Sequence, residues 1–216
     1  MGRPVPKWLK YGIVALLALL YNGWILESLL NPRMPAAPSL ISELSALTQP
    51  HHQVFQALDI VAGFLTLALC GFVWQLTRGL APRVRWLLTG LFAFVGIDSI
   101  VDALLPISCA PSVDMHCYAL APHILITTAH GIESNIAGTA VALLPAVWWW
   151  QHRARHRVIE KISLWFAGIQ IILGIIALTV RLSGKDSYGI IQRIYEGGVG
   201  LWISTIVGTA ILRQPA

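Results

Sequence analysis

Two aspartates and a histidine lie in or beside apolar stretches of the sequence, where their side chains could transfer protons or bind a metal ion. Asp98 and Asp102 are four residues apart, so a helix would place both carboxylates on one face. Two carboxylates this close repel each other and need a cation, a proton or an arginine between them. Histidine exchanges protons near neutral pH, so His130 is a candidate general base or metal ligand. Ser134 lies one turn after His130 and shares its helical face.

Further ionisable groups lie at a similar depth in other apolar segments: Glu27, Asp59, Glu133, Arg193 and Glu196. Charged side chains are costly inside a bilayer and usually face a protein interior or a water-filled cavity. Individual members also have simpler interpretations. Glu27 could lie at the membrane interface, and Arg193 and Glu196 could form an ion pair within one helix. Taken together, the groups predict one polar cavity that opens towards the outer leaflet.

The elements that must position these residues are membrane-spanning helices. The chain has 216 residues, of which 56% are hydrophobic and 12% are charged, and this charged fraction is about half that of a typical soluble domain. In lipid an apolar segment must be helical, because its backbone has no water to bind. We predict an all-α fold, a single transmembrane domain that is a six-helix bundle, with outer loops at 31–53, 106–122 and 183–188. The six segments, each long enough to cross about 30 Å of hydrocarbon, are 11–30, 54–76, 86–105, 123–150, 162–182 and 189–212.

The distribution of charge predicts the orientation of this bundle. Eleven of the fifteen lysines and arginines fall on one side, and nine of the ten acidic residues fall on the other. Because short cytoplasmic loops are enriched in lysine and arginine, both termini are predicted to be cytoplasmic. The net charge of +5 is then a topology signal and gives no reason to propose nucleic-acid binding. We expect an integral protein of the plasma membrane, the inner membrane in a bacterium, with its pocket facing the periplasm or exterior.

The outer loops carry two structural signals. Cys109 and Cys117 flank a proline-containing loop on the oxidising side, which predicts a disulfide between them. A metal site is the weaker interpretation, since two thiols at this spacing match no zinc motif. Residues 40–45 predict a short helix on the membrane surface, with Ser39 as its N-cap and Glu43 in its first turn. The last apolar segment has a face of small residues suited to close helix packing, within the chain or between chains: Gly197, Gly200, Ser204 and Gly208.

Three blocks of sequence resemble the bacterial and archaeal membrane proteins grouped as domain-of-unknown-function family 998. They are Ile41-Ser42-Glu43-Leu44-Ser45 with Phe55-Gln56-Ala57-Leu58-Asp59 and Gly63, then Asp102-Ala103-Leu104-Leu105-Pro106 through the paired cysteines to His130, and finally Gly189-Ile190-Ile191-Gln192-Arg193-Ile194 with Trp202. The family is similar in layout to six-helix membrane proteins of the Frag1 type. It has a looser likeness to a superfamily of transmembrane hydrolases that includes alkaline ceramidases. That likeness implies Ser, Asp and His groups at the membrane face, with a metal in several members, although this sequence lacks their HxxxH pair on a late helix.

One functional hypothesis is a lipid-active hydrolase or acyltransferase at the outer leaflet. His130 would be the general base or a metal ligand, and Asp98 and Asp102 would orient it or hold a metal-bound water. The cofactor in that case is a divalent metal such as zinc, held by these three side chains. Ser42 or Ser134 would be the nucleophile.

In the same hypothesis Arg193 would hold a lipid phosphate, and the acidic lining would attract a cationic headgroup such as an aminoacylated lipid. That lining comprises Glu27, Asp59, Glu133 and Glu196. The alternative hypothesis is a non-catalytic membrane protein that binds lipid or an unknown protein partner. An ion or proton transporter is disfavoured, because residues 61–73, 87–95 and 141–147 hold no charge.

Overall fold

The computed structural model describes residues 6–118, 129–155, 158–183 and 187–212, and this part of the chain is helical without strands. Its six long helices overlap the six predicted apolar segments, although residues 119–128 of the fourth segment lie outside the described residues. The long helices are α1 (Lys7–Tyr21), α3 (His52–Leu76), α4 (Pro82–Leu104), α7 (Ala129–His152), α8 (Val158–Leu182) and α9 (Tyr188–Leu212). The short ones are η1 (Gly23–Leu26), α2 (Glu27–Leu30), η2 (Ile41–Ser45), α5 (Met115–Tyr118) and η3 (Arg153–Arg155).

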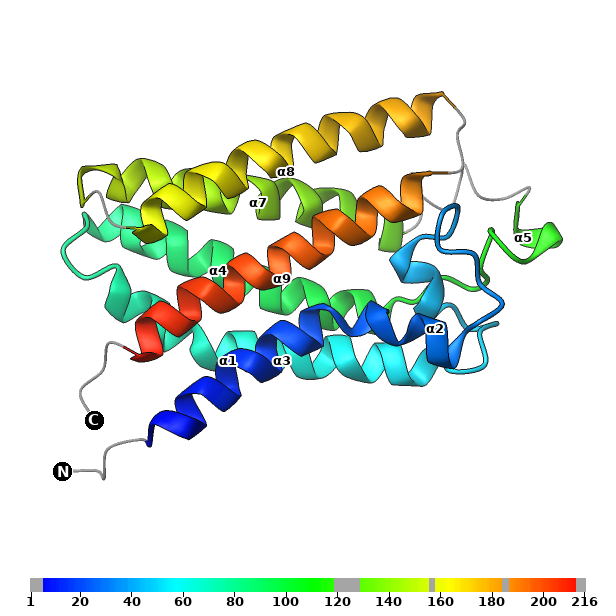
Figure 1. Ribbon diagram of the computed structural model, residues 1–216, viewed down its shortest axis with the longest axis horizontal. Coiled ribbons are helices and arrows are strands. Elements are labelled where there is room, and N and C mark those ends of the chain that lie inside the picture. Colours follow the sequence, from blue (N-terminus) through cyan, green and yellow to red (C-terminus); the bar gives the residue numbers. More distant parts are fainter. Residues whose placement is uncertain (1–5, 119–128, 156–157, 184–186, 213–216) are drawn as a thin grey trace.

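The long helices form a closed ring of neighbours. Helix α1 contacts α9, α9 contacts α8, α8 contacts α7, α7 contacts α4, and α4 contacts α3, which contacts α1 again. Helix α3 also contacts α9 across the ring. The start of α1, the α3–α4 turn, the α7–α8 junction and the end of α9 lie at one end of the bundle (Figure 1). The segments α2, η2 and α5 lie at the opposite end, which we call the outer end (Figure 1).

Helices α3 and α4 form a tight hairpin because two glycines face each other. A Cβ on Gly63 would lie 2.4 Å from the Gly96 carbonyl oxygen, and a Cβ on Gly96 would lie 2.9 Å from the Gly63 carbonyl oxygen. The two backbones therefore approach more closely than any larger residue allows. At the turn, Gly79 has a φ of +93°, a conformation that glycine adopts without steric cost. Arg85 braces the same turn by donating from Nε to the Trp74 carbonyl over 3.0 Å.

The sequence predicts one continuous helix over residues 11–30, but the structure has a helix that is broken after Tyr21. Helix α1 ends at Tyr21, and the following segment, Gly23–Leu30, bends away by 64°. Asn22 turns its side chain back to donate to the Ala18 carbonyl over 2.8 Å. Asparagine and glycine are weak helix formers, so Asn22-Gly23 is a point at which other contacts can break the helix. The break carries Glu27 towards α9.

The small-residue face of α9 packs against α1 of the same chain. A Cβ on Gly200 would lie 2.6 Å from the Cβ of Tyr21, and one on Gly208 would lie 3.3 Å from Val14. The main core lies along this contact and extends to α3, α4 and α7, with Leu17, Phe92, Trp202 and Ile206 among its fully buried members. The small-residue face of α9 thus packs against a helix of the same chain, the first of the two arrangements that the sequence allowed.

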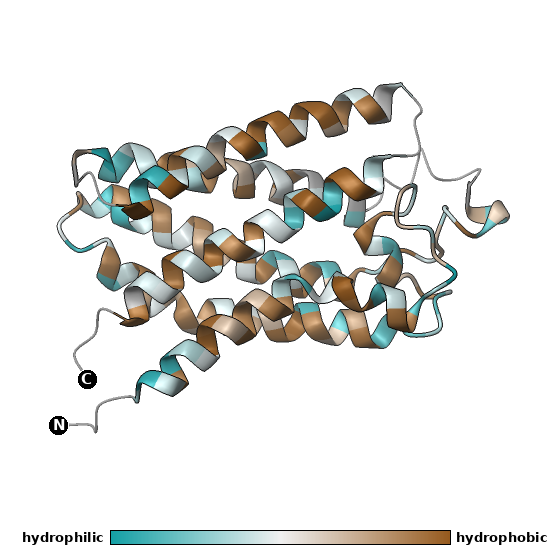
Figure 2. Ribbon diagram, in the orientation of Figure 1, coloured by the Kyte–Doolittle hydropathy of each residue, from teal (hydrophilic) through white to brown (hydrophobic). Residues whose placement is uncertain are grey.

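Three described helices are long and apolar enough to cross a membrane by length and composition: α3, α4 and residues 158–180 of α8. A fourth span results if α1 and its bent continuation count as one. Large apolar side chains such as Trp165, Ile172 and Leu178 are exposed on α8, and Figure 2 shows hydrophobic colouring along much of this helix. Exposed apolar surface of this extent is typical of a membrane or partner contact, so the apolar helices indicate a membrane protein.

Candidate functional site

Asp102 and His130 contact each other at the outer half of the bundle. Asp102 lies in the last turn of α4, and His130 lies in the first turn of α7. The His130 Nδ1 is 3.2 Å from the Asp102 Oδ1, and the side chains are 5% and 25% exposed. The distance is that of an ion pair without hydrogen-bond geometry, because His130 Nδ1 has no hydrogen-bond partner among the described residues. A small rotation of the ring would let Nδ1 donate to the carboxylate and leave the other ring nitrogen for proton transfer.

Two more carboxylates lie within electrostatic range of this pair. Asp59 of α3 interacts with both Asp102 and Glu196, and Glu196 of α9 interacts with Asp102. Asp59, Asp102, His130 and Glu196 are here called the carboxylate–histidine cluster. Four different helices supply its members, so the ring of helices must be assembled before the cluster exists. Several carboxylates held together in an apolar region require protons or a cation to offset their repulsion.

The other predicted site residues belong to α4, α7 and the outer loop. Asp98 is half-buried, one turn before Asp102, and acts electrostatically on Tyr21 of α1. Ser134 is exposed, and its hydroxyl donates to the His130 backbone carbonyl over 2.9 Å. Ser42 is half-buried in η2. Glu133 belongs to α7, but its side chain lies outside the described part of the chain.

Arg193 pairs with Glu27, from the segment after the break in α1, rather than with Glu196. The Arg193 Nε donates to both carboxylate oxygens of Glu27, over 2.9 and 3.1 Å, and Nη2 donates to one of them. The Nη1 group donates to the carbonyls of Ala36, Ser39 and Gly189 over 2.9, 2.7 and 3.0 Å. The guanidinium is buried and its charge is neutralised within the protein. These contacts hold the outer loop on α9, while a contact of Arg193 with a lipid phosphate stays a prediction.

A metal site at Asp98, Asp102 and His130 was one prediction from the sequence. Among the described residues, no group of three or more His, Cys, Asp or Glu side chains is arranged to hold a metal ion. Asp102 and His130 adjoin each other, but a zinc site takes three or four protein ligands. The described side chains do not supply a donor set that fits zinc, and we derive no chemical step through a metal.

A comparison with protein-family models identifies the family of this chain. Residues 13–209 match the model described as "Protein of unknown function (DUF998)", which covers most of the chain and the whole carboxylate–histidine cluster. The chain belongs to the DUF998 family. No curated protein and no solved structure matches it. The family has no assigned activity.

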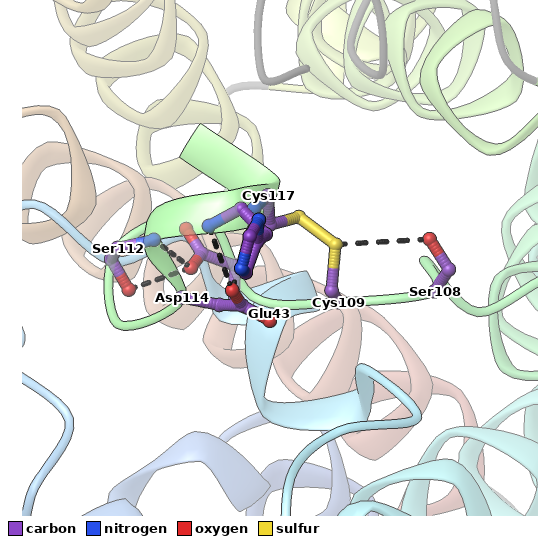
Figure 3. Close-up of a disulfide and its surroundings, with 7 residues drawn as sticks. Glu43, Ser108, Cys109, Ser112, Asp114 and Cys117 are labelled. Atoms are coloured by element: carbon purple, nitrogen blue, oxygen red, sulfur yellow. Dashed lines mark hydrogen bonds between the residues drawn. A yellow bond between two sulfur atoms is a disulfide. The ribbon is translucent and has the colours of Figure 1, made fainter. Parts of the chain in front are cut away.

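The outer end of this DUF998 chain is organised by Glu43, which the sequence suggested only as an acid in the first turn of a short helix. Its Oε1 accepts a hydrogen bond from the Leu40 backbone N–H over 2.9 Å. Its Oε2 accepts from the Ser112 N–H over 2.9 Å and from the Ser112 hydroxyl over 2.6 Å. Figure 3 shows Glu43 reaching the loop that holds Ser112 and Asp114. One buried carboxylate thus joins the two outer loops over the end of the bundle.

The predicted N-cap Ser39 has a different role. Leu40 precedes η2 as its N-cap, and the Ser39 hydroxyl donates to the Pro35 carbonyl over 2.6 Å and lies 2.7 Å from the Ser112 hydroxyl. Glu43 does lie in the first turn of η2, as predicted. Ser39 is fully buried between the loops, and this tertiary contact takes its hydroxyl away from capping.

The predicted disulfide between Cys109 and Cys117 is confirmed, with Cα atoms 6.0 Å apart (Figure 3). We expect Cys109→Ser combined with Cys117→Ser to lower the free energy of unfolding by about 2.5 kcal/mol, the loop-closure value for so short a ring. The measurement is thermal unfolding of purified protein in detergent. Cys70→Ser is the matched control, since Cys70 carries no disulfide. Equal melting temperatures for the double variant and wild type would contradict the expectation.

Proposed function

We propose that the chain is a single-domain integral membrane protein that crosses the bilayer six times. Both termini would be cytoplasmic, in a bacterial plasma membrane, and the carboxylate–histidine cluster would face the periplasm or exterior. Two features support this topology. The six long helices have lengths of 15 to 25 residues and share one bundle. The described basic segments, at the start of α1, in the α3–α4 turn and in η3, lie at the end opposite the disulfide (Figure 1).

We further propose that the cluster hydrolyses a lipid ester or amide, with His130 as general base. The Asp102–His130 contact of 3.2 Å is the observation that carries this proposal. As the oxygen of a water molecule bonds to the lipid carbonyl carbon, His130 would take a proton from that water through Nε2. The proton would then pass to the leaving oxygen or nitrogen as its bond to the carbonyl carbon breaks. Asp102 would hold the ring and stabilise the imidazolium that forms in between.

The direction of the Ser134 hydroxyl favours water over serine as the nucleophile. Ser134 donates to the carbonyl of its own helix at His130, whereas a serine nucleophile must donate to the imidazole of its base. The same general base would serve an acyltransferase if a second alcohol replaced water. Both reactions act on the same class of bond in a membrane lipid.

Binding without chemistry is the second candidate, and the excess of carboxylates favours it. Asp59, Asp102 and Glu196 interact with one another, and His130 is the basic member of the cluster. The nearby Arg193 is neutralised by Glu27. A lipid with a cationic headgroup, such as an aminoacylated phospholipid, would supply the balancing charge.

Turnover in nanodiscs separates the two candidates. Wild-type protein would be reconstituted with neutral glycerolipids, anionic phospholipids and aminoacylated phosphatidylglycerol, and products followed by mass spectrometry. We expect His130→Gln to lower the turnover rate by about a hundredfold, as is typical for loss of a general base. His51→Gln is the matched control, because His51 is exposed. Unchanged turnover in His130→Gln would remove this residue from the chemistry.

If no lipid is turned over, measured binding of the aminoacylated lipid would support the second candidate, a protein that binds a cationic lipid without chemistry. Its affinity would then fall in Asp59→Asn and Glu196→Gln, and would persist in His130→Gln. Equal binding of aminoacylated and unmodified phosphatidylglycerol would count against a cationic ligand.

A further inference from the structure

A groove lies on the side of the bundle, between α8, α9 and the break after α1, with a volume of about 340 Å³. This volume is at the lower end of the range found for small-molecule sites. Its walls include the exposed side chains Ile169 of α8 and Leu201 of α9, so it opens towards the surroundings of the apolar helices. Residues Arg193 and Gly197 of α9 line the groove, while Glu196 interacts with Asp59 and Asp102. The groove is therefore separate from the carboxylate–histidine cluster.

Two side chains lining this groove have polar atoms that lack hydrogen-bond partners among the described residues. Gln170 is 1% exposed, and its Nε2 donates to the Tyr195 carbonyl over 3.1 Å, so its Oε1 is left as a buried acceptor without a donor. Trp24 Nε1 is a buried donor without an acceptor. A buried polar atom without a partner costs about 1–3 kcal/mol, and native structures rarely leave one without a ligand, a water or another role.

Two adjacent glycines keep the polar floor of the groove open. A Cβ on Gly197 would lie 3.0 Å from Asn22 Oδ1 and 3.5 Å from Trp24 Cζ2. A Cβ on Gly198 would lie 3.2 Å from Gln170 Nε2. The Trp24 ring and the Gln170 amide thus adjoin consecutive residues of α9.

The charge of the groove selects a neutral ligand. Arg193 also lines it, but its guanidinium is paired with Glu27 and bound to three carbonyls. An anionic headgroup would meet a cation that is already compensated, and would be held next to the Glu27 carboxylate.

We propose that this groove binds a monoacylglycerol-like lipid, through an ester carbonyl that accepts from Trp24 Nε1 and a glycerol hydroxyl that donates to Gln170 Oε1. The single acyl chain lies along Ile169, Leu173 and Leu201. The volume of about 340 Å³ favours one chain over two. This site stands independently of the chemistry proposed for the cluster, because the two share no residue.

Photocrosslinking tests the proposal on the full chain in nanodiscs. The probes are a diazirine-bearing monoacylglycerol, the matching fatty acid and the matching phosphatidylglycerol, with crosslinked peptides identified by mass spectrometry. We expect the monoacylglycerol to label peptides of α8 and α9 around Leu173 and Leu201. Loss of one hydrogen bond in Trp24→Phe should lower its apparent affinity about fivefold. Equal or stronger labelling of these peptides by the fatty acid or the phosphatidylglycerol would overturn the neutral-lipid assignment.

Two matched tryptophans test the position of the site. Ile169→Trp fills the groove, whereas Ile172→Trp places the same side chain on an exposed position of the same helix outside it. The first should abolish monoacylglycerol labelling and the second should leave it unchanged. Equal labelling in both variants would overturn the site. Lipid turnover by the cluster is a separate readout, so a failure here is distinguishable from a failure of the proposed hydrolase.

Discussion

Arg193→Ala is expected to lower the free energy of unfolding by about 3–5 kcal/mol, the usual cost of removing one partner of a buried ion pair. The arginine is 4% exposed, and its loss leaves the Glu27 carboxylate without its counterion. It also removes the donor shared by the Ala36, Ser39 and Gly189 carbonyls. Thermal unfolding of the purified protein in detergent, followed by circular dichroism, measures the effect.

Arg33→Ala is the matched control, because Arg33 is an exposed arginine of the outer loop. It should melt at the wild-type temperature. The double variant Glu27→Leu with Arg193→Met should recover part of the loss, since apolar side chains carry no unpaired buried charge. If Arg193→Ala and Arg33→Ala melted at the same temperature, the ion pair would have no role in stability.

The second large effect is expected at Glu43. Glu43→Ala should lower the free energy of unfolding by about 3 kcal/mol, because it removes the acceptor for three hydrogen bonds to a buried carboxylate. The donors at Leu40 and Ser112 would lose their partner. Since these bonds join the two outer loops, cleavage by an added protease should accelerate in the outer loops more than in the α3–α4 turn.

Two further variants make the Glu43 prediction specific. Ser112→Ala removes the hydroxyl bond but keeps both backbone bonds, so it should cost clearly less than Glu43→Ala. Thr48→Ala changes an exposed residue of the same outer loop and should have no effect. A melting temperature for Glu43→Ala equal to that of Thr48→Ala would show that the carboxylate does not hold the loops.

Composition and periodicity predicted the long helices well, because a stretch of apolar residues is a local property of the sequence. The break at Asn22 was missed for the opposite reason. An asparagine and a glycine within an apolar stretch are compatible with a continuous helix. The bend instead accompanies the ion pair between Glu27 and Arg193, whose separation of 166 residues is invisible to any local pattern.

In the candidate site, too, local sequence patterns predicted the residue types but not the long-range pairings. Rarity of intramembrane charge identified Asp59, Asp102, His130 and Glu196 as members of one polar region, and the structure brings them together. Sequence spacing could not distinguish Asp98 from Asp102 as the partner of His130, since both share a helical face. It also gave Arg193 a nearby partner in Glu196, whereas the structure pairs it with Glu27. Gln170 was overlooked, although a lone amide within an apolar helix is a usable signal for a buried polar contact.

The pairing of Glu27 with Arg193 also imposes an order on biosynthesis. A ribosome completes the first helix long before it makes the last one, so a nascent chain carries Glu27 without its counterion until α9 has been synthesised and packed. The outer loop likewise has no docking surface until Gly189 and Arg193 arrive. A chain truncated before α9 therefore displays an unpaired carboxylate beside the membrane.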